Sequence, residues 1–198
     1  MNRRHLLLAA GAGISSFALP AWAATPAEDF VANNIHTGFV LLNDHSLDAT
    51  QRRDRFAAFV LGLTDTKRVA LFLLGRYADT ASPADIDLYV AAYQDYILAV
   101  YQSYFAMYAG QSLRVLDSRE RAAQDFVVRT TIVGNAPQME IDFRVRTDGP
   151  KPVLVDMSVA GIWLALAQRD QFLAVLAQNN GDIKALVSHL RDTQKLYR

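Results

Sequence analysis

The stretch DLYVAAYQDYILAVYQSYFAMY, residues 87–108, carries six of the chain's eight tyrosines in an otherwise apolar run. At about 100° per residue, most of its large side chains fall on one broad stripe of a helix. The stripe comprises Tyr89, Tyr93, Tyr96, Val100, Tyr104 and Met107, extended by Ile97, Tyr101 and Tyr108. Such a pattern is typical of a core helix. However, six phenol oxygens are easier to satisfy around a cavity with a polar opening than in a dry interior.

Residues at both ends of this stretch predict where the helix begins and ends, and further helices are predicted on either side of it. Ser82 is a good N-cap, Pro83 suits the first helical position, and Gly110 suits a left-handed end. Three helices are expected before it and two near the C-terminus, at about 26–44, 47–62, 65–78, 162–178 and 183–196.

Between these helical regions, hydrophobic residues recur at every second position, as in a β-strand, and no longer at helical spacing. Four strands are predicted, at 113–118, 126–134, 138–146 and 152–161. In the third strand, Met139, Ile141, Phe143 and Val145 alternate with charged or polar residues, so one face is buried and the other is wet. The expected fold class is α+β, with a four-stranded antiparallel sheet covered by helices on one face.

The N-terminus has the three parts of an export signal. Arg3 and Arg4 precede an apolar run, and Ala21-Trp22-Ala23 forms a cleavage site. We therefore expect residues 1–23 to be a cleaved signal peptide, of the Sec or twin-arginine type, and residues 24–198 to form a single domain. A periplasmic location and a monomeric protein are expected.

Composition and missing motifs exclude several classes of function. The chain has no cysteine, and its 20 basic and 20 acidic residues balance, which disfavours a nucleic-acid partner. It lacks the common nucleophile-elbow, P-loop, zinc-helix and dinucleotide-binding motifs. His36 and His45 would point to opposite sides of a helix. We therefore expect no catalytic residue, metal or cofactor.

Two alternatives stay open on the residues alone. Asp156, in an apolar strand, could act as acid or base with Tyr101 as oxyanion donor in a small cone-shaped enzyme for an apolar substrate. Its simpler interpretation is a carboxylate that satisfies backbone N–H groups or an arginine. The tyrosine helix could also pack against a partner in a structural protein.

Several stretches together resemble the MlaC family of periplasmic phospholipid-binding proteins. They are LGRY at 74–77, SPAD at 82–85, the tyrosine helix, IDFRVR at 141–146 and VDMSVAG at 155–161. The resemblance implies a curved sheet packed against helices, with lipid acyl chains in an apolar cavity between them. It also implies a carrier that shuttles phospholipid between an inner-membrane ABC transporter complex and an outer-membrane lipoprotein complex.

The resemblance, combined with periodicity, predicts the residues that contact lipid. The helical wall would comprise Tyr93, Ile97, Val100, Tyr101 and Tyr104. The sheet would contribute Val128, Thr130, Ile132, Ile141, Phe143, Val145, Val153, Val155 and Met157.

The chain departs from the family pattern near the last strand. Pro152 stands where the family often has tryptophan, and Ala160-Gly161-Ile162-Trp163 stands where it often reads Glu-Gly-Val-Ser. Assignment of this sequence to a related branch, associated with hopanoid lipids, is therefore an alternative.

Overall fold

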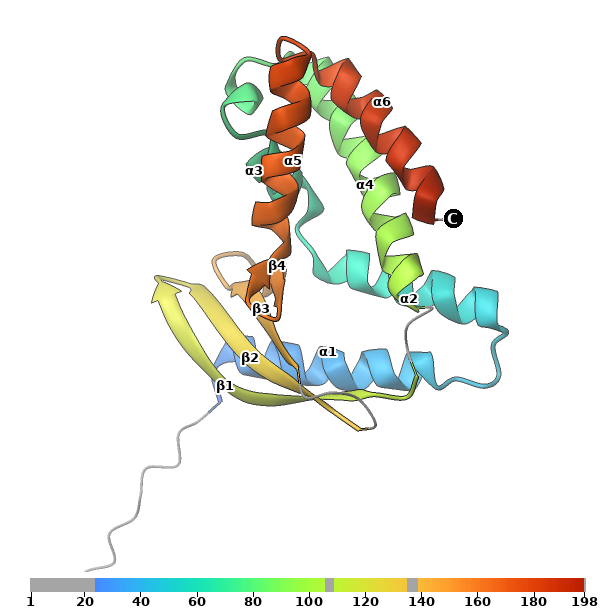
Figure 1. Cartoon of the computed structure of the whole chain (residues 1–198). Coiled ribbons are helices and arrows are strands. Elements are labelled where there is room, and N and C mark those ends of the chain that lie inside the picture. Colours follow the sequence, from blue (N-terminus) through green and yellow to red (C-terminus); the bar gives the residue numbers. More distant parts are fainter. Residues whose placement is uncertain (1–23, 106–108, 135–138, 198) are drawn as a thin grey trace, which may run out of the picture.

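The computed structural model describes residues 24–105, 109–134 and 139–197, without the side chains of residues 104 and 105. These residues form six α-helices and one antiparallel sheet (Figure 1). Helix α1 runs along the sheet, whereas α3, α4, α5 and α6 stand together above it (Figure 1). The α+β class predicted from the change of period is therefore confirmed.

Helix α4, Pro83–Phe105, is the predicted tyrosine helix. Its start is as expected, because the Asp85 N–H donates to Ser82 Oγ at 3.1 Å and Ser82 Oγ donates to the Asp85 carboxylate at 2.7 Å. Tyr89, Tyr93 and Tyr96 are all buried within the chain's own core. That burial argues against a structural protein that offers this tyrosine face to a partner.

The other helices lie close to their predicted ranges. Their bounds are α1 Pro26–Leu42, α2 Ala49–Leu63, α3 Thr66–Leu74, α5 Leu164–Gln178 and α6 Ile183–Gln194. Helix α3 is shorter than predicted because Gly75 has a positive φ of 52° and ends the helix, and a 3₁₀ turn, Gly75–Asp79, continues from it. A second 3₁₀ turn, Lys195–Tyr197, follows α6.

The sheet has five strands rather than the four predicted. They lie in chain order: β1 Ser112–Ala122, β2 Asp125–Val133, β3 Glu140–Arg146, β4 Val153–Val159 and β5 Ile162–Trp163. Ala160 and Gly161 both have positive φ, as a tight hairpin turn requires, and bring Trp163 opposite Ser158. We had assigned Ala160 and Gly161 to the fourth strand, because a two-residue strand is too short to show a period.

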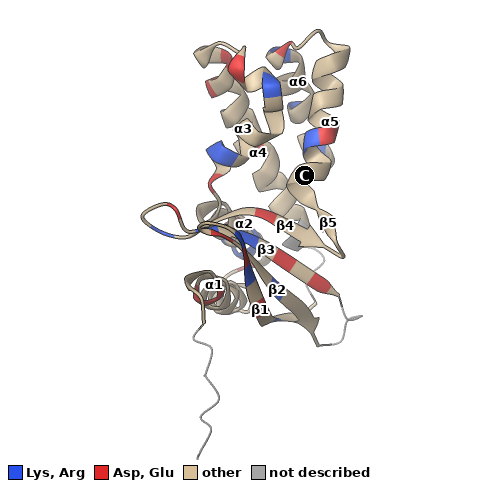
Figure 2. Cartoon of the chain, turned by 90° about the vertical axis from the view of Figure 1, so that its left-hand side faces the viewer, with Lys and Arg blue, Asp and Glu red and all other residues tan. Residues whose placement is uncertain are grey.

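The sheet face turned away from α1 carries charged residues of both signs (Figure 2). Arg129 pairs with Asp117, and Arg144 Nη2 lies 2.7 Å from Asp125 Oδ2. Asp125 is almost completely buried, at 4% exposure. The hydrogen bond from Arg144, helped by the charges of Arg144 and Arg146, lowers the pKa of Asp125 despite its burial.

This lowered pKa predicts an acid-sensitive contribution to stability. Asp125 should stabilise the fold fully above its unfolded pKa of about 3.9, and lose that contribution as the pH falls through the lower folded pKa. The free energy of unfolding of wild type should therefore fall more steeply than that of Asp125→Asn between about pH 5 and about pH 2. Denaturant titrations of both proteins would measure this, and parallel pH profiles would contradict it.

Candidate lipid-binding cavity

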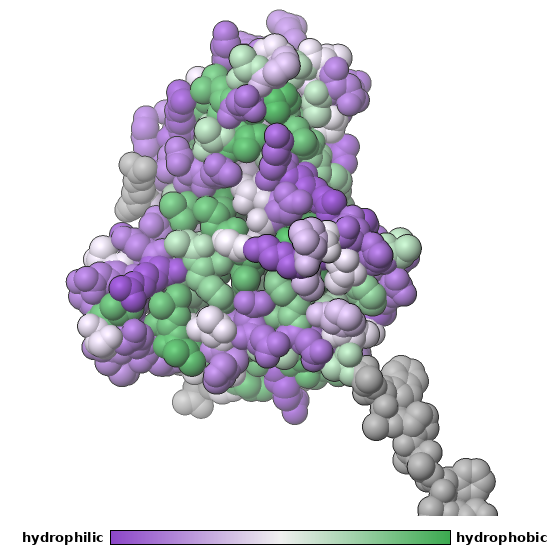
Figure 3. All heavy atoms as spheres, turned by 180° about the vertical axis from the view of Figure 1, so that it is seen from behind, coloured by the Kyte–Doolittle hydropathy of each residue, from purple (hydrophilic) through white to green (hydrophobic). Residues whose placement is uncertain are grey.

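A cavity of about 640 Å³ lies between the inner face of the sheet and helices α1, α2, α4 and α5. Its lining is mainly aliphatic and aromatic, with a few polar side chains such as Asn34, Gln111, Gln168 and Gln171. Seen from behind, hydrophobic residues show between polar ones across the middle of the molecule (Figure 3). An apolar cavity with a few polar groups is typical of a small-molecule site.

Helix α4 forms one wall of this cavity. Tyr93, Ile97, Val100 and Tyr101 line it, as the helical stripe predicts, and the side chain of Tyr104 lies outside the described part of the chain. Tyr96 also lines the cavity, although we had not included it among the lipid-contacting residues. Its position on the same helical stripe as Tyr93 and Val100 could have predicted that it lines the cavity.

The tyrosine hydroxyls find partners inside the protein. Tyr89 donates to the Ala70 carbonyl at 3.1 Å, and Tyr93 donates to Gln168 Oε1 at 3.4 Å. The Gln168 amide nitrogen in turn donates to the Tyr96 hydroxyl at 3.3 Å. Burial raises the pKa of Tyr89 and Tyr93, so both phenols stay neutral. One glutamine at the cavity therefore satisfies two of the tyrosines that a dry core would leave unpaired.

Contacts between aromatic rings, within α4 and between α4 and α5, support the wall that α4 forms. The rings of Tyr89 and Tyr93 lie 6.2 Å apart, and those of Tyr93 and Tyr96 lie 6.3 Å apart. Phe172 of α5 meets the Tyr93 and Tyr96 rings edge-on, at 6.3 and 6.2 Å. Such pairs add to the stabilisation from burial alone.

The sheet supplies the facing wall through the five predicted residues Ile132, Ile141, Phe143, Val155 and Met157. Three others lie on the sheet but not along the cavity. Val128 and Val145 are fully buried against Ala27 and Val31 of α1, and Thr130 donates to the Ile141 carbonyl at 2.6 Å. Val128 and Val145 are absent from the cavity because α1 packs directly on that part of the sheet.

A β-bulge in β4 moves Val153 away from the cavity. The register pairs Val145 with Leu154 and Arg144 with Asp156, which leaves Val155 as the extra residue. Leu154 therefore lines the cavity in place of Val153. Strict alternation through the strand cannot predict such a change of phase.

Helices α1 and α2 contribute the part of the lining that our prediction missed. Phe30, Ile35, Phe39 and Leu42 of α1 line the cavity together with Phe56, Phe59, Val60 and Leu63 of α2. The apolar side of α1 is visible in the sequence as a periodic pattern. The pattern does not say whether that side meets a core or a cavity.

A comparison with family models gives a match over residues 35–192, to the family described as MlaC protein. The match covers most of the chain and contains nearly all of the cavity lining. The chain belongs to the MlaC family. This family is periplasmic, and membership supports a binding or transport protein.

A solved structure shares the MlaC-like fold. It is that of a phospholipid-binding protein from Ralstonia solanacearum, in complex with a phospholipid. The two chains superpose with a TM-score of 0.70 at 20% sequence identity, over 87% of this chain and 96% of the other. At this identity the likeness establishes the fold, including the open antiparallel sheet covered by helices.

Asp156 lines the cavity of this MlaC protein, as an enzymatic role would require, but its carboxylate has a structural use. Its Oδ1 accepts from the N–H of Met157 at 2.8 Å and from that of Ala165 at 2.9 Å. Ala165 lies in the first turn of α5, whose N-cap residue Trp163 offers no side-chain hydrogen bond. Burial raises the pKa of Asp156, and these two hydrogen bonds and the charge of Arg144 oppose the rise. Asp156 thus caps α5 from the neighbouring strand.

This capping role gives a stability prediction. Asp156→Ala should lower the free energy of unfolding by about 1–3 kcal/mol, because two buried N–H groups lose their acceptor. Asp156→Asn is the matched control, since its amide oxygen can still accept from Ala165. Urea unfolding of the three proteins would measure the difference. Equal losses in both variants would show that the negative charge, and not the acceptor, matters.

Proposed function

We propose that this protein carries a phospholipid, with the acyl chains held in the cavity between α4 and the sheet. The cavity is the observation that carries this proposal. Its volume of about 640 Å³ and its apolar walls suit hydrocarbon. The phospholipid in the related Ralstonia solanacearum structure supports the same class of ligand.

Burial of hydrocarbon supplies enough free energy for such a carrier. Each methylene group taken from water contributes about 0.8 kcal/mol, so two acyl chains can hold a lipid without any covalent or catalytic step. The polar groups of the lining are few, and Gln168 is already hydrogen-bonded to two tyrosines. The cavity therefore suits binding and release better than chemistry.

The wider role in this proposal is transport across the periplasm. The carrier would take lipid between an inner-membrane ABC transporter complex and an outer-membrane lipoprotein complex, after export and removal of residues 1–23. Family membership supports this role. In the described residues, no helix has the length and apolar character needed to cross a membrane.

Lipid extraction from protein purified out of the periplasm tests the proposal. Mass spectrometry of the extract should find about one diacyl phospholipid per protein. A protein that repeatedly carries no lipid, and takes none from vesicles, would contradict the carrier function. A co-purifying hopanoid would retain the carrier function but replace the ligand.

A further inference from the structure

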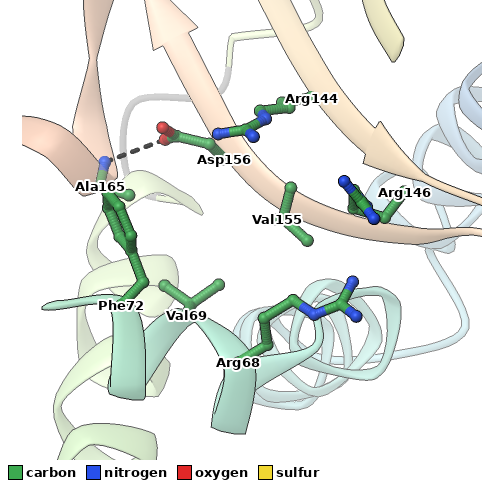
Figure 4. A pocket seen from close by; sticks show the side chains of 8 residues that line it. All are labelled: Arg68, Val69, Phe72, Arg144, Arg146, Val155, Asp156 and Ala165. Carbon is green, nitrogen blue, oxygen red and sulfur yellow. Dashed lines mark hydrogen bonds between the residues drawn. The ribbon is translucent and has the colours of Figure 1, made fainter. Parts of the chain in front are cut away.

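A second, smaller pocket of about 300 Å³ lies between α3 and strands β3 and β4 (Figure 4). Arg68, Val69 and Phe72 rise from α3 on one side, and side chains of β3 and β4 face them. Four of its lining residues also line the large cavity: Val69, Val155, Asp156 and Ala165. The small pocket therefore adjoins the large one at these shared residues.

Three arginines give this small pocket, here called the arginine pocket, its chemical character. Arg68, Arg144 and Arg146 line it from two elements that are far apart in the sequence. Carboxylates hold each of them in place. Arg68 and Arg146 donate to Asp148 at 3.2 and 2.6 Å, and Arg144 donates to Asp125 at 2.7 Å.

These ion pairs leave donor capacity on the arginines. A guanidinium has five N–H groups, and a carboxylate takes only two or three of them. Guanidinium groups match the oxygens of a phosphate in geometry as well as charge.

The residues around the arginine pocket also favour an anionic ligand. Arg169 lies 4.6 Å over the ring of Phe72, and it forms no salt bridge within the described part of the chain. Asp156, the acidic member of the lining, has one oxygen engaged by the N–H groups of Met157 and Ala165. Arg144 and Arg146 keep their charge, because the neighbouring carboxylates raise the pKa of both.

We propose that the arginine pocket binds the phosphate of the lipid whose acyl chains occupy the large cavity. This inference rests on the proposed carrier function and specifies its ligand. The lipid must carry a phosphate next to its acyl chains, which favours a phospholipid over a neutral hopanoid. Arg68 and Arg146 are the residues that select it.

A competition between two lipids with identical acyl chains tests this. Lipid-free protein is incubated with vesicles that contain equal amounts of phosphatidic acid and diacylglycerol, repurified, and extracted for mass spectrometry. Wild type should take up phosphatidic acid roughly tenfold more than diacylglycerol, since each charge-assisted hydrogen bond favours the phosphate. Arg68→Gln and Arg146→Gln should both bring the ratio close to one.

Arg129→Gln is the matched control, because Arg129 also pairs with an aspartate and lines neither pocket. Its ratio should equal that of wild type. Arg68 is 45% exposed, so Arg68→Gln tests the inference even if Arg146→Gln does not fold. An equal uptake of both lipids by wild type, or a ratio unchanged by Arg68→Gln, would overturn the inference while leaving the carrier function intact. Uptake of neither lipid would overturn the proposal that this protein carries a phospholipid.

Inorganic phosphate distinguishes a lipid phosphate from a free one. Millimolar phosphate added to the vesicle mixture should leave the lipid ratio unchanged, because phosphate without acyl chains lacks the hydrophobic contribution. A site for free phosphate would instead show calorimetric saturation by inorganic phosphate and loss of the phosphatidic acid preference. That result would overturn the inference.

Discussion

Ile141→Trp is expected to abolish most lipid binding while leaving the protein folded. Ile141 is the second residue of β3 and lines the large cavity, so an indole at this position would fill volume that the acyl chains would occupy. Val100→Trp should act in the same way from α4. Val100 is only 7% exposed and belongs to the core, so its replacement should also cost about 1–3 kcal/mol of stability through overpacking.

The measurement is the amount of phospholipid bound per protein after incubation with vesicles and repurification. Leu116→Trp is the matched control, because Leu116 is 42% exposed on β1 and does not line the cavity. It should bind as much lipid as wild type. Circular dichroism and the unfolding midpoint would establish that Ile141→Trp is folded. Full lipid occupancy in both cavity variants would show that the acyl chains lie elsewhere.

Phe172→Ala is expected to cause the largest loss of stability among these variants. Phe172 is 2% exposed and meets two tyrosines of the cavity wall edge-on. Truncation of a buried phenylalanine costs about 3–5 kcal/mol, because contacts are lost and a cavity remains. The whole free energy of unfolding of a domain is about 5–15 kcal/mol, so the variant should be marginally stable.

Guanidinium-induced unfolding would measure this loss. Phe72→Ala is the control, since Phe72 is 40% exposed and contacts Arg169 at the surface, so its truncation should cost about 1 kcal/mol or less. If both variants lost similar stability, the tyrosine wall would not depend on Phe172 for support.

The sequence predicted the fold best where local signals were strong. Ser82 and Pro83 marked the start of α4, and the alternation of β3 correctly identified the side that faces the cavity, with Ile141 and Phe143 in the lining. Both features depend on residues close together in the chain. Their physical causes, capping and the two-residue strand period, act without help from the rest of the fold.

The predicted cavity lining was wrong where a single backbone irregularity, or the packing of an element distant in sequence, determined which side chains face the cavity. Because of the bulge at Val155, Leu154 lines the cavity and Val153 does not, and no residue type in that strand predicts the bulge. The docking of α1 on the sheet turned Val128 and Val145 into ordinary core residues. The arginine pocket was invisible for the same reason, because Arg68 and Arg146 come together only through packing of α3 against the β3–β4 hairpin.

In the two proposals made above, the large cavity and the arginine pocket hold different parts of one lipid. The tyrosine helix provides a neutral wall for hydrocarbon, because the hydroxyl groups of Tyr89, Tyr93 and Tyr96 are engaged by Gln168 and by backbone. The arginine pocket, which shares Val69 and Val155 with the large cavity, provides guanidinium N–H donors. This arrangement would let one site bind phospholipids with different acyl chains.

Photo-crosslinking with a phospholipid that carries a diazirine near the end of one acyl chain tests the central claim most directly. After irradiation of the loaded protein, peptide mass spectrometry locates the modified residues. The account predicts adducts on α4 between Tyr93 and Tyr101 and on the facing strand at Ile141 and Phe143. Adducts confined to the charged outer face of the sheet, or none in a protein shown to be loaded, would contradict it.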